Sequence, residues 1–153
     1  MVGIAPAEAT NGNVIPLPAP NDVRGELEQI RNAARAVPTL SSAERERVVD
    51  RILALLHERF LPRGDTEEAT IYPTNARALS EEVTASLVFD HLLIEAQAAE
   101  LAAADPRDGA KLQELLYGIR VLMDSHLERE QHLYARLPFG SGEARRALAR
   151  SER

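Results

Sequence analysis

The sequence predicts an all-α protein folded as an up-down-up-down four-helix bundle. Its 153 residues are rich in Ala, Leu, Glu and Arg, and only 4% are aromatic, a composition that favours helices packed on helices over a sheet. Apolar residues recur every three or four positions in four segments, as they do on helices with one buried face. Short connections join these segments, so consecutive helices are expected to pack side by side in opposite directions.

The first helix is expected from Asp22, as its N-cap, to Ala36, because Pro38 then stops it. Ser41 and Glu44 have the spacing of a capping box, which opens the second helix. The apolar positions of the first helix step by four and three residues: Val23, Leu27, Ile30, Ala34 and Val37.

The second helix is expected to continue to about Tyr72, although Pro62 and Gly64 should bend or loosen it. Pro73 should end it. Its apolar positions are Val49, Ile52, Leu56 and Phe60.

Ser80 is the expected cap of the third helix, and the turn "ADPRDG" separates that helix from the fourth. The segment "LPFGSG" should break the fourth helix. The core-facing positions of the third helix are Leu87, His91, Ile94, Ala98 and Leu101. Those of the fourth are Leu112, Leu115, Ile119, Leu122, His126, Glu130, Leu133 and Leu137.

The predicted bundle occupies residues 22–138 and forms one domain. Residues 1–21 contain four prolines in a polar setting and are expected to be a flexible, Pro-rich arm, with a docking arm as the alternative. Residues 139–153 form a short basic tail that is expected to be helical.

Composition also excludes several classes of function. The net charge of −6 argues against general affinity for nucleic acid, and the absence of cysteine excludes disulfides, zinc–thiolate sites, iron–sulfur clusters and a cysteine nucleophile. No apolar run approaches the roughly 20 residues that span a bilayer, so no membrane partner is expected. Because the first residues lack the features of a secretory signal, the expected location is the cytoplasm.

Three of the four apolar stripes carry polar residues at core positions: Arg63 and Glu67, then His91, then His126 and Glu130. An isolated buried charge is too costly to tolerate, so these groups must bind each other, water or a metal ion. Histidines and glutamates that several helices direct at the axis of a bundle are typical of a carboxylate–imidazole metal site. A single histidine on an apolar face is more often a hydrogen-bonded core residue, and that alternative stays open.

The remaining candidate ligand residues do not lie on the apolar stripes. His57 and His132 lie beside other charges and are expected at the surface. Glu68 and Glu95 are expected to face away from the core. Asp90 precedes a core histidine and has the position of a hydrogen-bond partner for it, but a solvated carboxylate is the simpler interpretation.

The segments "VRGELEQI", "LLHERFLPRGDTEEATIYP", "VFDHLLIEAQAAEL" and "LLYGIRVLMDSHLEREQHLYARL" resemble, in this order, the four helices of the hemerythrin-like HHE cation-binding domain. The resemblance covers about residues 22–137 and is most specific in "EEATIYP" and "LYGIRVLMDSHLERE". It implies a hemerythrin-like bundle. Typical members of that family bind two irons joined by an oxygen bridge.

The resemblance also implies the metal ligands. The residues that match the family's ligand positions are Glu67, His91, His126 and Glu130. Leu27 and Arg63 stand where the family has its other two histidines, and both of those histidines serve the same iron. Leucine cannot ligate a metal, and a guanidinium stays protonated. Arg63 would therefore replace one metal ion by a fixed positive charge.

The resulting prediction is one metal ion per chain, iron or else Mn or Zn, since ligand type alone does not identify the ion. The alternatives are a metal-free bundle, in which Arg63 pairs with both glutamates, and a surviving two-metal site. The implied role is sensing or handling of oxygen, nitric oxide, peroxide or iron. The alternative role is a metal-free scaffold that binds a protein partner through the N-terminal arm or the basic tail. An enzyme would need an open coordination position and a substrate pocket, and the sequence shows neither.

Overall fold

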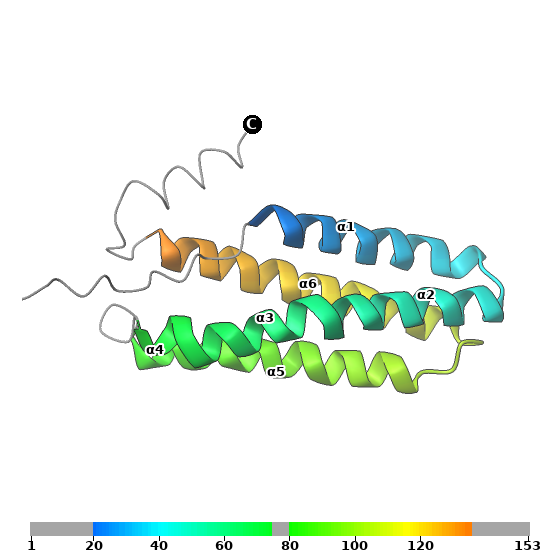
Figure 1. Cartoon of the computed structure of the whole chain (residues 1–153). Helices are drawn as coiled ribbons and strands as arrows, with labels where there is room; N and C mark the ends of the chain where they lie inside the picture. Colours follow the sequence, from blue (N-terminus) through cyan, green and yellow to red (C-terminus); the bar gives the residue numbers. More distant parts are fainter. Residues whose placement is uncertain (1–19, 75–79, 136–153) are drawn as a thin grey trace, which may run out of the picture.

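The computed structural model describes residues 20–74 and 80–135, and within these ranges it contains helices and no strand. Consecutive helical segments join into four long helical stretches, here called rods, which lie side by side (Figure 1). The predicted all-α bundle is therefore confirmed for the described residues. Most of the predicted N-terminal arm, the predicted tail, the segment "LPFGSG" and Leu137 lie outside them. Among the described residues, no helix combines the length and the apolar character that crossing a membrane requires.

The first rod is α1 (Pro20–Ala36), followed by the 3₁₀ turn η1 (Val37–Thr39). It begins two residues before Asp22, the expected N-cap, at a proline, a residue favoured in the first turn of a helix. It ends before Pro38, as predicted. All five apolar positions expected for this segment are buried: Val23, Leu27, Ile30, Ala34 and Val37.

The second rod runs from Ser42 to Thr74 without interruption. Ser41 and Glu44 form the predicted capping box, in which the Ser41 N–H donates to the Glu44 carboxylate at 2.8 Å. The segments of this rod are α2 (Ser42–Leu55), η2 (Leu56–Phe60), α3 (Leu61–Thr66), η3 (Glu67–Ile71) and α4 (Tyr72–Thr74).

Both η2 and η3 are π-turns, in which a backbone N–H bonds to the carbonyl five residues earlier. Each lies just before a proline, Pro62 or Pro73. Proline has no N–H, and its ring collides with the carbonyl four residues back, so a wider turn relieves the collision. Pro62 thus loosens the rod as predicted, whereas Pro73 does not end the helix, which includes Thr74, the last described residue of this segment.

The π-turns keep one face of this rod buried. Its buried residues advance in steps of four through Ile52, Leu56, Phe60 and Gly64, then reach Glu67. An α-helix turns once in 3.6 residues, so repeated steps of four would drift off the buried face. The extra residue of the π-turn η2 offsets that drift, and Glu67 therefore still points into the bundle.

The third and fourth rods are α5 (Glu81–Ala103) and α6 (Gly109–Tyr134). Ser80 caps α5 as predicted, and Asp108 caps α6 by accepting from the Lys111 N–H at 2.9 Å. The predicted α5 positions are all buried. On α6, Leu122 and Leu133 are only half-buried. The other described α6 positions are buried as predicted: Leu112, Leu115, Ile119, His126 and Glu130.

The rods pack as a closed ring, because α1 contacts α2, α2 contacts α5, α5 contacts α6 and α6 contacts α1. Arg45 bridges two connections at one end of the bundle. Its Nε donates to the Val37 carbonyl at 2.9 Å and its Nη1 to the Arg107 carbonyl at 3.1 Å. The α1–α2 and α5–α6 connections therefore meet at the same end (Figure 1).

Candidate metal centre

Three rods place polar side chains where two apolar clusters of the core meet. A large cluster includes Phe60, Ile94 and Met123, and a smaller one contains Ile71 and Leu87. Glu67 in η3 and His91 in α5 lie between the two clusters along their rods, and His126 in α6 lies beside His91. Apolar packing on both sides withdraws these groups from bulk water, which strengthens the electrostatic interactions among them.

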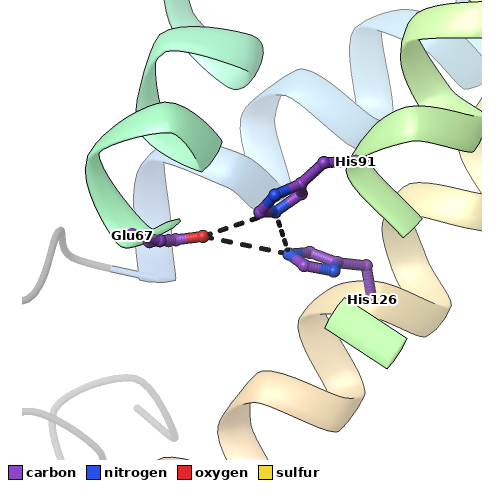
Figure 2. A group of neighbouring side chains, drawn as sticks. All are labelled: Glu67, His91 and His126. Atoms are coloured by element: carbon purple, nitrogen blue, oxygen red, sulfur yellow. Dashed lines mark hydrogen bonds and ion pairs between the residues drawn. The ribbon is translucent and has the colours of Figure 1, made fainter. Parts of the chain in front are cut away.

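The three side chains converge on one point (Figure 2). The Nε2 atoms of His91 and His126 are 3.0 Å apart, and Glu67 Oε2 lies 3.6 Å from the first and 4.0 Å from the second. One ligand atom from each residue lies within 4.8 Å of the other two, and all three residues are buried. A group of this kind can hold a metal ion, since ions bound to imidazole and carboxylate lie about 2.0–2.2 Å from each ligand atom.

The far side of each imidazole is held by a carboxylate. His91 Nδ1 lies 2.7 Å from Glu68 Oε1, and His126 Nδ1 lies 3.3 Å from Asp90 Oδ2. An ionised carboxylate only accepts, so each Nδ1 carries a proton and each neutral ring keeps its Nε2 lone pair. Two lone pairs 3.0 Å apart repel each other unless a cation, either a proton or a metal ion, lies between them.

These contacts correct two expectations. Glu68 does not face away from the site, because its carboxylate bonds His91 while the side chain remains 36% exposed. Asp90 is not solvated: it is buried between α5 and α6, where Arg129 Nη2 also contacts its Oδ2 at 2.6 Å. The expectations for His57, His132 and Glu95 are confirmed, and all three are exposed.

Arg63 joins the two glutamates of the site. Its Nε donates to Glu67 Oε1 at 2.8 Å and its Nη2 to Glu130 Oε2 at 2.9 Å. This is the pairing expected for a guanidinium that replaces a metal ion beside two carboxylates. It leaves Glu67 Oε2 directed at the histidines. Leu27 is buried in the large apolar cluster.

Glu130 lies beside the converging group rather than within it. Its Oε1 accepts from the Tyr134 hydroxyl at 3.0 Å and the Tyr72 hydroxyl at 3.4 Å, and is 3.7 Å from His126 Nε2. The sequence interpretation missed both tyrosines. Tyr134 was detectable, since a residue four positions after Glu130 shares its helix face.

Aromatic rings and a glycine shape the space around the histidines. Tyr72 stacks on the His91 ring at 13° between planes, and the Phe60 ring makes a T-shaped contact with each imidazole. Gly64 lies against His91, because a Cβ added there would be 3.0 Å from His91 Nδ1. The role of Gly64 was also missed, since the sequence indicates it only as a helix-loosening residue.

The two glutamates share one negative charge. Burial alone would raise the pKa of Glu67, but hydrogen bonds with His91 and Glu130 and the charge of Arg63 outweigh it and lower the pKa to about 2. Burial, together with the charge of Glu67, raises the pKa of Glu130 to about 8. At neutral pH, Glu67 is therefore ionised and Glu130 protonated, and Arg63 balances the remaining charge.

The two histidines also have pKa values that are shifted in opposite directions. Burial would lower the pKa of His91, but hydrogen bonds with Glu67 and Glu68 raise it above its ordinary value. Burial and the charge of His91 lower the pKa of His126 to about 4. In the metal-free protein, a proton between the two Nε2 atoms is therefore held by His91, and His126 is the acceptor. Metal binding must displace this proton, since ligating imidazoles are neutral.

No protein-family model, no curated protein and no solved structure matches this chain. The class that the structure defines is an all-helical bundle with a buried group of one glutamate and two histidines that can hold a metal ion.

Proposed function

We propose that this chain is a hemerythrin-like, up-down-up-down bundle that binds one divalent metal ion through His91, His126 and Glu67, with Glu130 as a further ligand. The observation that carries the proposal is the 3.0 Å contact between two Nε2 atoms whose rings are each bonded to a carboxylate through Nδ1. Carboxylate–histidine pairs of this kind orient imidazoles for metal binding and increase their basicity. Iron is the leading candidate, and Mn and Zn suit the same ligand types.

The protein residues that would hold the ion leave part of its coordination sphere to small ligands. Two imidazoles and one or two carboxylates are fewer than the six ligands of an octahedral ion. A bound metal would supply Lewis acidity and, in the case of iron, redox chemistry. We therefore propose a role in sensing or handling oxygen, nitric oxide, peroxide or iron in the cytoplasm.

Arg63 supports one metal rather than two. Its guanidinium bonds one oxygen of each glutamate, so the oxygens that would bridge a second cation are occupied by a fixed positive charge. A second divalent ion beside Arg63 would be repelled in a water-poor interior.

The same contacts favour a second candidate function, a metal-free scaffold that binds a protein partner. Each glutamate is paired with Arg63, and a proton between the histidines satisfies their Nε2 atoms without a metal. Such a network is physically reasonable, although buried ion pairs often add little to stability.

Metal content distinguishes the two functions. Untagged protein, purified without chelator and then exposed to Fe(II), Mn(II) or Zn(II), should contain close to one ion per chain by mass spectrometry. Its oxidised iron form should lack the near-ultraviolet absorption of an oxo-bridged diferric site. Two irons per chain with that absorption would contradict the one-metal proposal. If the protein bound no metal, the metal-free scaffold would be the remaining candidate function.

A further inference from the structure

The two histidines of the site are held unequally. Glu68 Oε1 approaches His91 Nδ1 to 2.7 Å, whereas Asp90 Oδ2 stays 3.3 Å from His126 Nδ1. Hydrogen bonds between nitrogen and oxygen are usually about 2.9–3.0 Å long, so the contact to His126 is a weak one. The difference is not explained by burial, because Asp90 is far more buried than Glu68.

Arg129 explains the weak contact. Its Nη2 lies 2.6 Å from Asp90 Oδ2, the same oxygen that faces His126, and its Nη1 donates to Ser86 Oγ at 3.0 Å. A charged donor competes strongly for a carboxylate oxygen and draws its electron density away from a weaker donor. Arg129 and His126 thus share one acceptor atom, and Arg129 has the shorter contact.

We propose that Arg129 and Asp90 are positioning residues that weaken metal binding at His126 and connect the site to the protein surface. The inference rests on the proposed function. A carboxylate bonded to Nδ1 of a ligating histidine raises the basicity of Nε2. Arg129 reduces this effect at His126, because it binds the same Asp90 oxygen. Because the Arg129 side chain is 44% exposed, an acidic group that bound it at the surface would release Asp90 to His126 and tighten the site.

The test compares Arg129→Gln, Asp90→Asn and the double variant by Zn(II) affinity, measured in competition with a chromophoric chelator. Arg129→Gln should tighten Zn(II) binding about threefold to tenfold, because Asp90 then bonds only His126. Asp90→Asn should weaken it about tenfold to a hundredfold. In the double variant, loss of Arg129 should have no further effect, since it acts through Asp90.

Arg120 supplies the matched control. It lies on the same helix and pairs at 3.7 Å with Asp124, an exposed residue. Arg120→Gln removes the same charge from α6 and should leave Zn(II) affinity unchanged. Tighter binding in Arg120→Gln, or an effect of Arg129→Gln that persists beside Asp90→Asn, would show a general charge effect and overturn the inference.

A second readout needs no metal. In ¹⁵N-labelled protein kept free of metal, Arg129→Gln should shift the Nδ1 resonance of His126 towards that of a stronger hydrogen bond and leave His91 unchanged. If the wild-type protein binds no Zn(II), the proposed function fails while this measurement still tests the inference. Unchanged His126 resonances in Arg129→Gln would overturn the inference whether or not metal binds.

Discussion

Gly64 and His91 belong to different helices and touch: a Cβ at Gly64 would lie within 3.0–3.1 Å of three atoms of the imidazole ring. A Cβ contact of 3.0–3.1 Å is tighter than nine in ten real ones, so a side chain at position 64 requires the imidazole ring to move by a few tenths of an ångström. The ring is held on its other sides by Glu68 and by the stacked Tyr72. Position 64 therefore determines where His91 can direct its Nε2.

Gly64→Ala should destabilise the protein and weaken metal binding. Overpacking a core position costs about 1–3 kcal/mol, which exceeds the gain of about 1 kcal/mol from replacing glycine within a helix. Urea unfolding and Zn(II) titration measure the two effects. Gly25→Ala is the control: a Cβ at this exposed helical glycine meets nothing within 4 Å, so this variant should be slightly stabilised. If Gly64→Ala were stabilised as much as Gly25→Ala, a side chain at position 64 would not be in close contact with His91.

His126→Ala should abolish metal binding and leave a folded bundle. It removes one Nε2 from the converging group and leaves a cavity that costs about 1–3 kcal/mol. Metal analysis and far-ultraviolet circular dichroism measure these results. His132→Ala, on the exposed side of the same helix, should change neither. Wild-type metal content in His126→Ala would place the site elsewhere.

The stability of the metal-free protein should fall as pH rises above about 6.5, where His126, whose pKa is lowered, is neutral in both the folded and the unfolded state. The pKa of Glu130 is raised from 4.5 to about 8, so the folded state holds a proton that the unfolded state has lost. This contribution is complete below the unfolded value and is lost as pH rises through about 8. His91, whose pKa is also raised, adds a change of the same sign.

Glu130→Gln isolates the contribution of Glu130 to the pH dependence of stability, because glutamine keeps the shape of the protonated acid and does not titrate. Urea unfolding across a pH series from about 7 to 9 should show a weaker dependence of stability on pH, and so a smaller slope, in this variant than in the wild type. The slope should not vanish, since His91 still titrates. Identical slopes would mean that Glu130 is ionised in the folded protein.

Leu27→His combined with Arg63→His should create a site for two metal ions, and neither change alone should suffice. Each single change supplies one imidazole, and Leu27→His leaves the Arg63 charge beside both glutamates. The double variant should be less stable without metal, because it adds polar groups to the core and removes the charge that balances the glutamates. Iron should restore stability by binding the folded state.

Two irons per chain by mass spectrometry, with oxo-bridged diferric absorption, would be the expected result for the double variant. A double variant that folds and binds no more iron than the wild type would show that positions 27 and 63 do not face the metal site. The proposed residue-by-residue resemblance to the hemerythrin-like family would then be wrong at these positions.

The sequence by itself determined the helices and most of the buried positions. The spacing of apolar residues located all four rods, and the caps at Ser41 and Ser80 were read correctly, because caps and periodicity depend on residues close together in the chain. Polar residues on those stripes also identified Glu67, His91 and His126 as neighbours at the axis, since each helix has a single buried face.

Only the tertiary structure decided how these side chains are held. Periodicity did not reveal Asp90 as buried, because α5 is also apolar on its outer face, where Phe89 and Leu92 are exposed. It did not place Glu68, whose long side chain reaches His91 from the start of a π-turn. Helical spacing determines the direction of each Cα–Cβ bond, whereas the atoms that meet depend on side-chain length, local turns and the neighbouring helix.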